Sequence, residues 1–171
     1  MSDPPISIRP LERRDLPAAL AIQSATYPAF LVEDEAAFAS RLDVAASYCL
    51  AGVRGGALVA YLLAHGWPGR EPPSVGTLLE PTITGEALFI HDLAVSSEGR
   101  GSGIGSRLVS RAVALAAGDG LRRAELIAVE GAASYWRTLG FIEPAVTPAL
   151  AAKVAGYGAG ARWMERALSG S

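Results

Sequence analysis

A glycine-rich turn in the second half of the chain limits its folds more than any other feature. The turn has the sequence Arg100-Gly101-Ser102-Gly103-Ile104-Gly105-Ser106; residues 87–95 before it form an apolar run, and residues 104–117 show a helical pattern. Glycine lets bare backbone approach a ligand closely, and free N–H groups at a helix start favour an anion, most often a phosphate. The sequence therefore predicts a strand, a phosphate-binding turn and a helix, in that order.

Apolar spacing and turn residues divide the rest of the chain into short strands and helices. Strands are expected at residues 6–9, 48–53, 57–65, 87–95 and 126–129, at a segment beginning at Phe141, and at 161–168. Helices are expected from Asp15, which can cap the first one, and at 34–42, 104–117 and 132–139, with a short excursion at 147–154. No repeat and no shift of composition interrupts this order. We therefore predict a single layered α/β (α+β) domain over residues 1–171 with a mixed sheet.

Composition and charge exclude several classes of protein. Half of the 171 residues are hydrophobic and the net charge is −2, so the chain suits a packed domain and offers no electrostatic basis for binding nucleic acid or an acidic membrane. The single cysteine, Cys49, excludes an internal disulfide and a cysteine-based zinc site, and its apolar surroundings predict a buried thiol. Neither a signal peptide nor an apolar run of membrane-spanning length is found, so a cytoplasmic protein is expected.

The order of the expected elements and three motifs resemble the GCN5-related N-acetyltransferase (GNAT) superfamily. Its acetyl-CoA motif, Arg/Gln-x-x-Gly-x-Gly/Ala, is matched in full by Arg100 to Gly105. Leu93-Ala94-Val95 resembles the family's strand end, where backbone groups pair with the pantetheine arm as an added strand would. Tyr135 to Phe141 resembles the family's helix that ends in Gly-Phe. The resemblance covers essentially the whole chain, and it implies a mostly antiparallel sheet of about seven strands flanked by about four helices.

The resemblance also implies that the glycine-rich turn holds the pyrophosphate of coenzyme A. The glycines leave room for phosphates, Ser102 and Ser106 add hydroxyl donors, and Arg100 adds a positive charge. The cofactor-binding residues expected are Leu93, Ala94, Val95, Arg100, Gly101, Ser102, Gly103, Ile104, Gly105, Ser106, Ser134 and Trp136. Two alternatives are a turn that binds nothing and a dinucleotide-binding turn, although the latter has the spacing Gly-x-Gly-x-x-Gly rather than the Gly-x-Gly-x-Gly found here.

Acetyl transfer to an amine requires a group that takes a proton from the amine, and His91 is the first candidate. It lies just before the expected strand end, and in the arylalkylamine branch of the family a catalytic histidine occupies the matching place. Histidine exchanges protons in the physiological pH range, but a hydrogen-bonded core histidine is the alternative. Strand alternation predicts that Asp92 points to the opposite face, where it orients a neighbour, attracts a cationic amine or serves as a structural carboxylate.

Three positions depart from the family pattern. Phe89 stands where many members carry a glutamate base, Trp136 where many carry a tyrosine that protonates the departing thiolate, and Val129 replaces a common asparagine. An indole N–H can donate a hydrogen bond but is a poor acid. Tyr135 is expected in the core, and Ser134 is a further candidate to reach the sulfur. The proton donor is therefore unassigned, with water as an alternative.

The acceptor site is expected between the first two helices and the late loops, with Tyr27, Phe30 and Glu33 as its candidate residues. Acidic and aromatic side chains together suit a cationic, partly apolar amine, although Glu33 to Glu35 also fit a solvated helix start. We expect an acetyl-CoA-dependent N-acetyltransferase that acts on a primary amine in a ternary complex and needs no metal. The expected partner is a small-molecule or peptide amine, and pairing into a homodimer is an open alternative to a monomer. A non-catalytic acyl-CoA-binding module is the alternative function.

Overall fold

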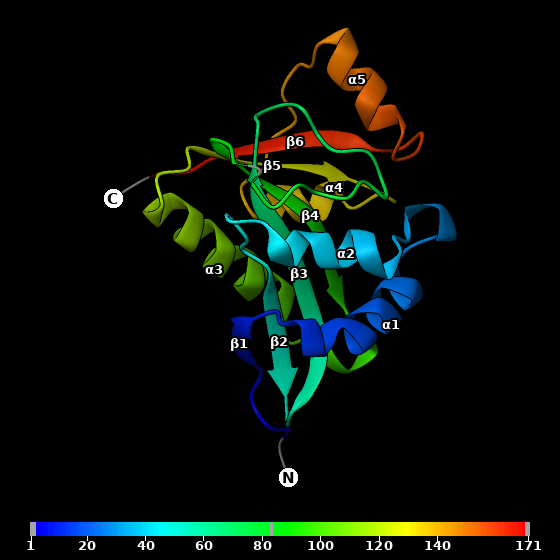
Figure 1. The fold of residues 1–171 in the computed structure, drawn as a ribbon, viewed down its shortest axis with the longest axis vertical. Coiled ribbons are helices and arrows are strands. Elements are labelled where there is room, and N and C mark those ends of the chain that lie inside the picture. The colour runs from blue at the N-terminus through cyan, green and yellow to red at the C-terminus, as the bar shows by residue number, and fades with distance from the viewer. Residues whose placement is uncertain (1–2, 83, 170–171) are drawn as a thin grey trace.

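The computed structural model describes residues 3–82 and 84–169, and its six strands form one sheet in chain order (Figure 1). The strands are β1 (Ser7–Pro10), β2 (Leu50–Arg54), β3 (Ala57–Trp67), β4 (Ala87–Val95), β5 (Arg123–Ala128) and β6 (Arg162–Ala167). Neighbouring strands are antiparallel except for the parallel pair β4 and β5. The expectation of a mixed, mostly antiparallel sheet is therefore confirmed.

The described sheet has six strands where about seven were expected. The segment after Phe141 forms a single isolated bridge, between Ile142 and Glu165. Pro144 follows almost at once, and proline both lacks the N–H that would extend the ladder and restricts the residue before it. The expected seventh strand is thereby reduced to one residue pair.

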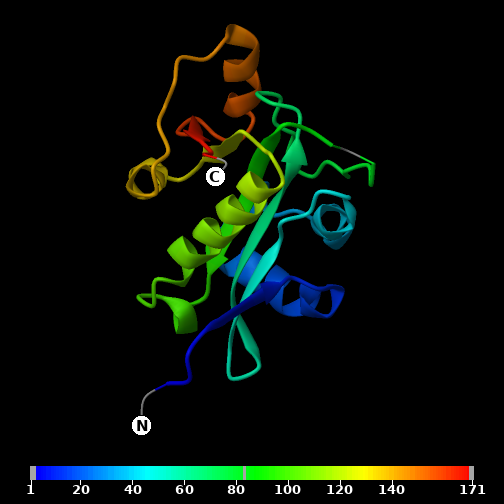
Figure 2. The same cartoon turned by 90° about the vertical axis from the view of Figure 1, so that its left-hand side faces the viewer.

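Helices cover both faces of the sheet (Figure 2). The α-helices are α1 (Leu16–Thr26), α2 (Glu35–Asp43), α3 (Ile104–Gly118), α4 (Ala133–Thr138) and α5 (Pro148–Ala155). Short 3-10 turns comprise Arg13–Asp15, Ala29–Leu31 and Ser97–Gly99. α1 and α2 pack on one face of the sheet and α3 packs on the other. Within the described ranges, no helix is long and apolar enough to cross a membrane.

One helix start agrees with the expectation and another differs from it. The excursion expected near the C-terminus is the helix α5, which begins because the Thr147 hydroxyl accepts a hydrogen bond from Leu150 N (3.1 Å) and Pro148 fits the first turn. Asp15 does not cap α1 with its side chain. It accepts a hydrogen bond from Glu12 N (2.8 Å) instead, and so closes the 3-10 turn that precedes α1.

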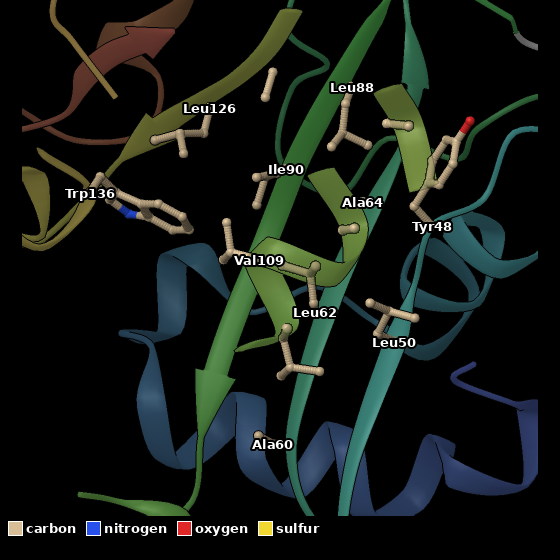
Figure 3. Packing of buried hydrophobic residues seen from close by; sticks show 14 of the residues in the cluster. Tyr48, Leu50, Ala60, Leu62, Ala64, Leu88, Ile90, Val109, Leu126 and Trp136 are labelled. Carbon is tan, nitrogen blue, oxygen red and sulfur yellow. The ribbon is translucent and has the colours of Figure 1, made fainter. Parts of the chain in front are cut away.

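The core forms two layers because side chains along each strand alternate between the faces of the sheet. In β3, Ala60 and Leu62 pack beneath α3, as Figure 3 shows, while Tyr61 and Leu63 face α1 and α2. Cys49 is buried in this second layer, as predicted.

The strand β4 pairs with β5 over less than half of its length, because the parallel pairing stops at Ile90. Against β3 its register shifts by one residue: Leu63 lies opposite Asp92 and Ala64 opposite Ile90, so His91 has no partner. A β-bulge of this kind bends a strand and re-aims its side chains. Among the described residues, no strand pairs with this edge of β4 beyond Ile90, so β4 combines a bulge with an open edge.

Candidate active site

The bulge in β4 places His91 and Asp92 on the same face of the sheet, toward α1 and α2. Asp92 Oδ2 accepts a hydrogen bond from the Tyr61 hydroxyl on that face (3.2 Å), and His91 Nε2 lies 2.6 Å from Glu33 in the connection between the two helices. The expectation that Asp92 points to the opposite face is therefore wrong. Alternation holds only in an unbroken ladder, and the extra residue of a bulge shifts it by one.

A cavity of about 240 Å³ opens where β4 and β5 part. Both His91 and Asp92 contribute to its wall, and so does Glu130, which follows β5. Aromatic and aliphatic side chains form most of the remainder, among them Tyr27, Leu31, Phe89, Trp136 and Tyr157. The cavity is thus mostly apolar and carries a few acidic groups, which is typical of a small-molecule site.

Glu33 links the α1–α2 connection to the bulge. Its Oε1 lies 2.6 Å from His91 Nε2, and its Oε2 accepts hydrogen bonds from Arg41 Nη2 (2.6 Å) and Gly76 N (2.8 Å). The side chains of Arg41, Glu33 and His91 are 0%, 2% and 3% exposed. Burial alone would raise the pKa of Glu33, but the hydrogen bond and charge of His91, the charge of Arg41 and the Gly76 N–H together lower it. A solvated helix start is therefore wrong for Glu33.

The ionised Glu33 also decides which nitrogen of His91 carries a hydrogen. A carboxylate only accepts hydrogen bonds, so at 2.6 Å the Nε2 atom must be the donor. The Nδ1 atom is buried and has no hydrogen-bond partner in the part of the chain that the structure describes. One nitrogen of His91 is thus committed to Glu33, and the other is shielded from solvent.

Asp92 keeps one carboxylate oxygen unpaired at the cavity wall. Within residues 3–82 and 84–169, Tyr61 is its single hydrogen-bond partner, and it bonds to Oδ2. Burial raises the pKa of Asp92 to about 6, although the nearby charge of His91 opposes this. A carboxyl group that titrates near neutral pH can accept a proton from an amine more readily than an ordinary one.

Tyr27 lies across the uncovered edge of β4. Its hydroxyl donates a hydrogen bond to Leu93 O (2.8 Å) and accepts one from Leu93 N (3.2 Å). Tyr27 also lines the cavity. An expected acceptor residue is therefore in direct contact with an expected cofactor residue.

The glycine-rich turn forms a groove beside the cavity. Gly101 and Gly103 have φ angles of +77° and +79°, which favour glycine, and a Cβ added at either would meet nothing within 4 Å. Among the described residues, no acceptor is bound to the backbone N–H groups of Gly103, Gly105 and Ser106. The groove is lined by Leu93, Val95, Gly99, Arg100, Gly101, Gly103, Ile104, Gly105, Ser106 and Tyr135. Unpaired donors at the start of a long helix fit an anionic group such as a pyrophosphate.

Some of the expected cofactor residues serve the fold instead. The Ser102 hydroxyl donates to Gly99 O and accepts a hydrogen bond from Ile104 N (3.3 Å), so it stabilises the turn. The side chains of Ala94 and Ile104 pack in the two core layers and leave only backbone groups for a ligand. Ser134 is exposed and lines neither the groove nor the cavity.

The helix α4 presents Tyr135 to the groove. Tyr135 is 38% exposed and lines both the groove and the cavity, and its hydroxyl lies 2.8 Å from the position of a Cβ added at Gly105. Trp136 is 7% exposed and packs against Phe141, with ring centroids 5.4 Å apart, although part of it reaches the cavity. The expectation of a core Tyr135 is wrong, because successive helix residues point about 100° apart and Trp136 takes the core direction.

Phe30, the third expected acceptor residue, lies outside the cavity. It is 55% exposed, and its ring packs near Gly158 in the loop before β6. Tyr27 and Glu33 line the cavity, but the oxygens of Glu33 are already occupied. No cluster of three or more potential metal-ligating side chains occurs among the described residues.

Sequence reasoning missed two residues that hold this site together. Arg41 pairs with Glu33, and Tyr61 bonds to Asp92. Arg41 lies within an ordinary helical pattern and Tyr61 within an apolar strand, so neither position carries a local signal. Their roles follow from the fold, which brings α2 and β3 to the bulge.

Comparison with known proteins agrees with this geometry. The sequence model of the Acetyltransferase (GNAT) family matches residues 11–141. No curated protein sequence gives a significant match to the chain.

Solved structures share the fold at low sequence identity. Ribosomal-protein-S18-alanine N-acetyltransferase from Escherichia coli is 19% identical with a TM-score of 0.69, covering 97% of this chain and 96% of that one. PaiA N-acetyltransferase from Thermoplasma acidophilum, in complex with coenzyme A, is 14% identical with a TM-score of 0.63, covering 98% and 99%. GphF, a GNAT-like decarboxylase in complex with isobutyryl-CoA, is 18% identical with a TM-score of 0.71, covering 95% and 100%. Because the family model matches most of its length, this chain belongs to the Acetyltransferase (GNAT) family.

Proposed function

We propose that this protein transfers an acetyl group from acetyl-CoA directly to a primary amine, with both substrates bound at once. One observation carries the proposal: the groove of unpaired N–H groups and the cavity that holds Asp92 are contiguous, since Leu93 and Tyr135 line both. A single ligand held by its phosphates in the groove can therefore extend into the cavity.

The chain offers suitable groups for the pyrophosphate and for the pantetheine arm of coenzyme A. The N–H groups of Gly103, Gly105 and Ser106 would hold the pyrophosphate, with Arg100 beside it. The uncovered edge of β4 at Leu93 would hold the pantetheine arm. When bound, acetyl-CoA supplies an acyl carbon activated as a thioester. Two proteins of the same fold have been solved with such ligands. They are PaiA N-acetyltransferase from T. acidophilum in complex with coenzyme A, and GphF in complex with isobutyryl-CoA.

Asp92 is best placed to take the proton of the attacking amine. It lines the cavity with one carboxylate oxygen unpaired among the described residues, and its pKa is about 6. His91, by contrast, directs one nitrogen to Glu33 and shields the other. We assign His91 and Glu33 as positioning residues that hold the bulge and aim Asp92 into the cavity.

Tyr135 is the proposed proton donor for the departing thiolate. Its hydroxyl lies near Gly105, where the groove and the cavity meet. A phenol carries an acidic hydrogen, whereas the indole of Trp136 does not serve as an acid. Many family members carry a proton-donating tyrosine at the position of Trp136. Tyr135 would take over that role here.

The proposed acceptor is a cationic primary amine with a small apolar body. Asp92 and Glu130 line the cavity, and among its described lining residues no lysine or arginine offsets them. The surrounding wall is aromatic and aliphatic, which favours an apolar group next to an ammonium. The E. coli protein of the same fold is named for a protein alanine acceptor, so a peptide α-amine belongs in the same class to be tested.

The test is a panel of amines mixed with acetyl-CoA and the purified protein, with free thiol and acetylated amine both measured. The panel contains a polyamine, an arylalkylamine, an amino acid and a short peptide beginning with alanine. Thiol release that depends on one of these amines is the expected result. Asp92→Asn should lose this amine-dependent thiol release. Asp3→Asn, the same change in the exposed start of the chain, is the matched control and should keep it.

A non-catalytic acyl-CoA-binding module is the second candidate. Phe89 and Trp136, which stand at the two acid–base positions of the resemblance, favour it. It predicts calorimetric binding of acetyl-CoA with no thiol release for any amine. A protein that binds neither acetyl-CoA nor coenzyme A contradicts both candidates.

A further inference from the structure

β5 does not pair with the part of β4 that follows Ile90, but a side chain of the protein, Tyr27, bonds to this edge at Leu93. The N–H and the C=O of Leu93 both bond to the Tyr27 hydroxyl, at 3.2 Å and 2.8 Å, and therefore point away from the partner strand β3. β5 stops pairing with β4 at Ile90 and leaves this edge open. One hydroxyl group thus satisfies a donor and an acceptor that would otherwise be unpaired.

The backbone around Tyr27 is held in place. Tyr27 N donates to Gln23 O (2.9 Å) as the last turn of α1 ends. Gln23 in turn exchanges two hydrogen bonds with the backbone of Glu33, at 2.9 Å and 3.1 Å. Both ends of the segment from Tyr27 to Glu33 are therefore anchored, so displacement of the hydroxyl from Leu93 requires rotation of the Tyr27 side chain.

We propose that the Tyr27 hydroxyl competes with the acyl-CoA arm for the backbone of Leu93. This inference rests on the proposed function, because it is the pantetheine arm and thioester that would use the same N–H and C=O groups. Tyr27 leaves the edge when acyl-CoA binds and returns when coenzyme A departs, so it lowers cofactor affinity and favours product release. Because the ring also lines the cavity, cofactor binding reshapes the acceptor site.

The test compares Tyr27→Phe with the wild type by calorimetric titration with acetyl-CoA. The variant keeps the ring and removes only the competing hydroxyl, which leaves the Leu93 groups unpaired until the cofactor arrives. We expect acetyl-CoA to bind about tenfold more tightly, since an unpaired buried polar group carries a penalty that the cofactor then removes. Tyr48→Phe removes a hydroxyl that bonds to Asp119 Oδ2 (2.7 Å), away from the cavity, and should leave the affinity unchanged.

A second ligand separates this inference from the proposed function. Adenosine 3′,5′-bisphosphate carries phosphates but no pantetheine arm, so its affinity should be equal in Tyr27→Phe and in the wild type. Equal or weaker binding of acetyl-CoA by Tyr27→Phe would overturn the inference and leave the proposed function standing. A wild-type protein that binds neither ligand would overturn both.

Amide exchange at Leu93 gives a readout that is independent of affinity. In the wild type the Leu93 amide donates to the Tyr27 hydroxyl, so it should be protected in the absence of ligand. In Tyr27→Phe it should exchange faster, and acetyl-CoA should restore its protection. Identical exchange of this amide in both unliganded proteins would argue against the competition.

Discussion

Asp92 carries a cost in stability that its place at the cavity wall explains. Burial raises its pKa to about 6 from an ordinary value of 3.8, so the folded protein keeps a proton that the unfolded chain has already released between about pH 4 and pH 6. The free energy of unfolding therefore falls as the pH rises through this window. A side chain that destabilises the fold at neutral pH is typical of a functional site.

Removing the charge of Asp92 should stabilise the protein at neutral pH. The shift of its pKa corresponds to at most roughly 3 kcal/mol in the free energy of unfolding. Asp92→Asn should regain part of this stability at pH 8, and the variant should have no such advantage near pH 4. Urea unfolding of both proteins at the two pH values measures the difference. Equal stability at pH 8 would mean that the Asp92 carboxyl is not destabilised by burial.

The same residue should shape the dependence of turnover on pH. If Asp92 accepts the amine proton, kcat/KM should rise as the pH increases through about 6, because only the ionised carboxylate is a base. Asp92→Asn should lower kcat/KM by about 10²–10⁴-fold and remove that limb of the profile. His91→Gln is the comparison: a limb that disappears there and persists in Asp92→Asn would assign the base to His91.

Gly103 tests the groove at the level of a single residue. Gly103→Glu places a carboxylate at the unpaired N–H groups, and acetyl-CoA binding should fall below calorimetric detection. Gly120→Glu is a matched control, because Gly120 lies beyond the other end of α3, has a φ of +89° and also has no atom within 4 Å of an added Cβ. Unchanged binding by Gly103→Glu would place the phosphates elsewhere.

At the scale of elements, the cluster of Arg41, Glu33 and His91 fastens α2 and the α1–α2 connection to β4. Arg41 also donates from Nη1 to Ala37 O (3.0 Å) and to Thr77 O (2.5 Å), so the loop before β4 joins the same network. A buried charge is tolerated here because each carboxylate oxygen of Glu33 has a partner. The network fixes the wall of the cavity from three separate segments.

Breaking this network should cost much more than breaking a surface ion pair. Arg41→Ala leaves the Glu33 charge buried without its arginine partner, and the free energy of unfolding should fall by about 3–5 kcal/mol. Arg13→Ala breaks the pair with Asp43, whose side chains are 65% and 43% exposed, and should cost less than about 1 kcal/mol. Urea unfolding compares the two variants, and similar losses would show that the buried pair is not the stronger element.

The limits of sequence reasoning are also found among the elements. The apolar run of β4 and the glycine turn before α3 were predictable, since hydrophobic pattern and glycine spacing are local signals. The bulge at His91 was not predictable, because it depends on the register of β4 against β3. Without that register, Asp92 was expected on the wrong face of the sheet. On α4, Tyr135 was expected in the core, but the helix turns Trp136 toward the core and leaves Tyr135 exposed.

At the scale of the whole molecule, a bound cofactor should stabilise the fold by mass action. Acetyl-CoA at a hundred times its Kd adds about 2.7 kcal/mol, and about 2–4 °C per kcal/mol is typical for a chain of this size, so Tm should rise by roughly 5–10 °C. NADH at the same concentration is the control and should leave Tm unchanged. A rise with NADH and none with acetyl-CoA would instead favour the dinucleotide-binding alternative.

The overall arrangement was predictable only where it follows from the order of strands and helices along the chain. The succession of strands and helices follows from local patterns, and the antiparallel pairing of β2 with β3 follows from the two-residue connection between them. The cavity was not predictable in this way. It exists because β4 and β5 separate after Ile90, and only the packed sheet decides where two parallel strands part.

The open edge of β4 also bears on how the unliganded protein behaves in concentrated solution. An unpaired strand edge is a template on which another chain can add a strand, and proteins commonly block such edges with charges, prolines or bulges. Here the bulge at His91 precedes the edge, and the phenol of Tyr27 caps the N–H and C=O of Leu93. The hydrogen bonds between Tyr27 and Leu93, which we propose compete with the cofactor, therefore also hinder the unliganded protein from pairing edge to edge with a second copy.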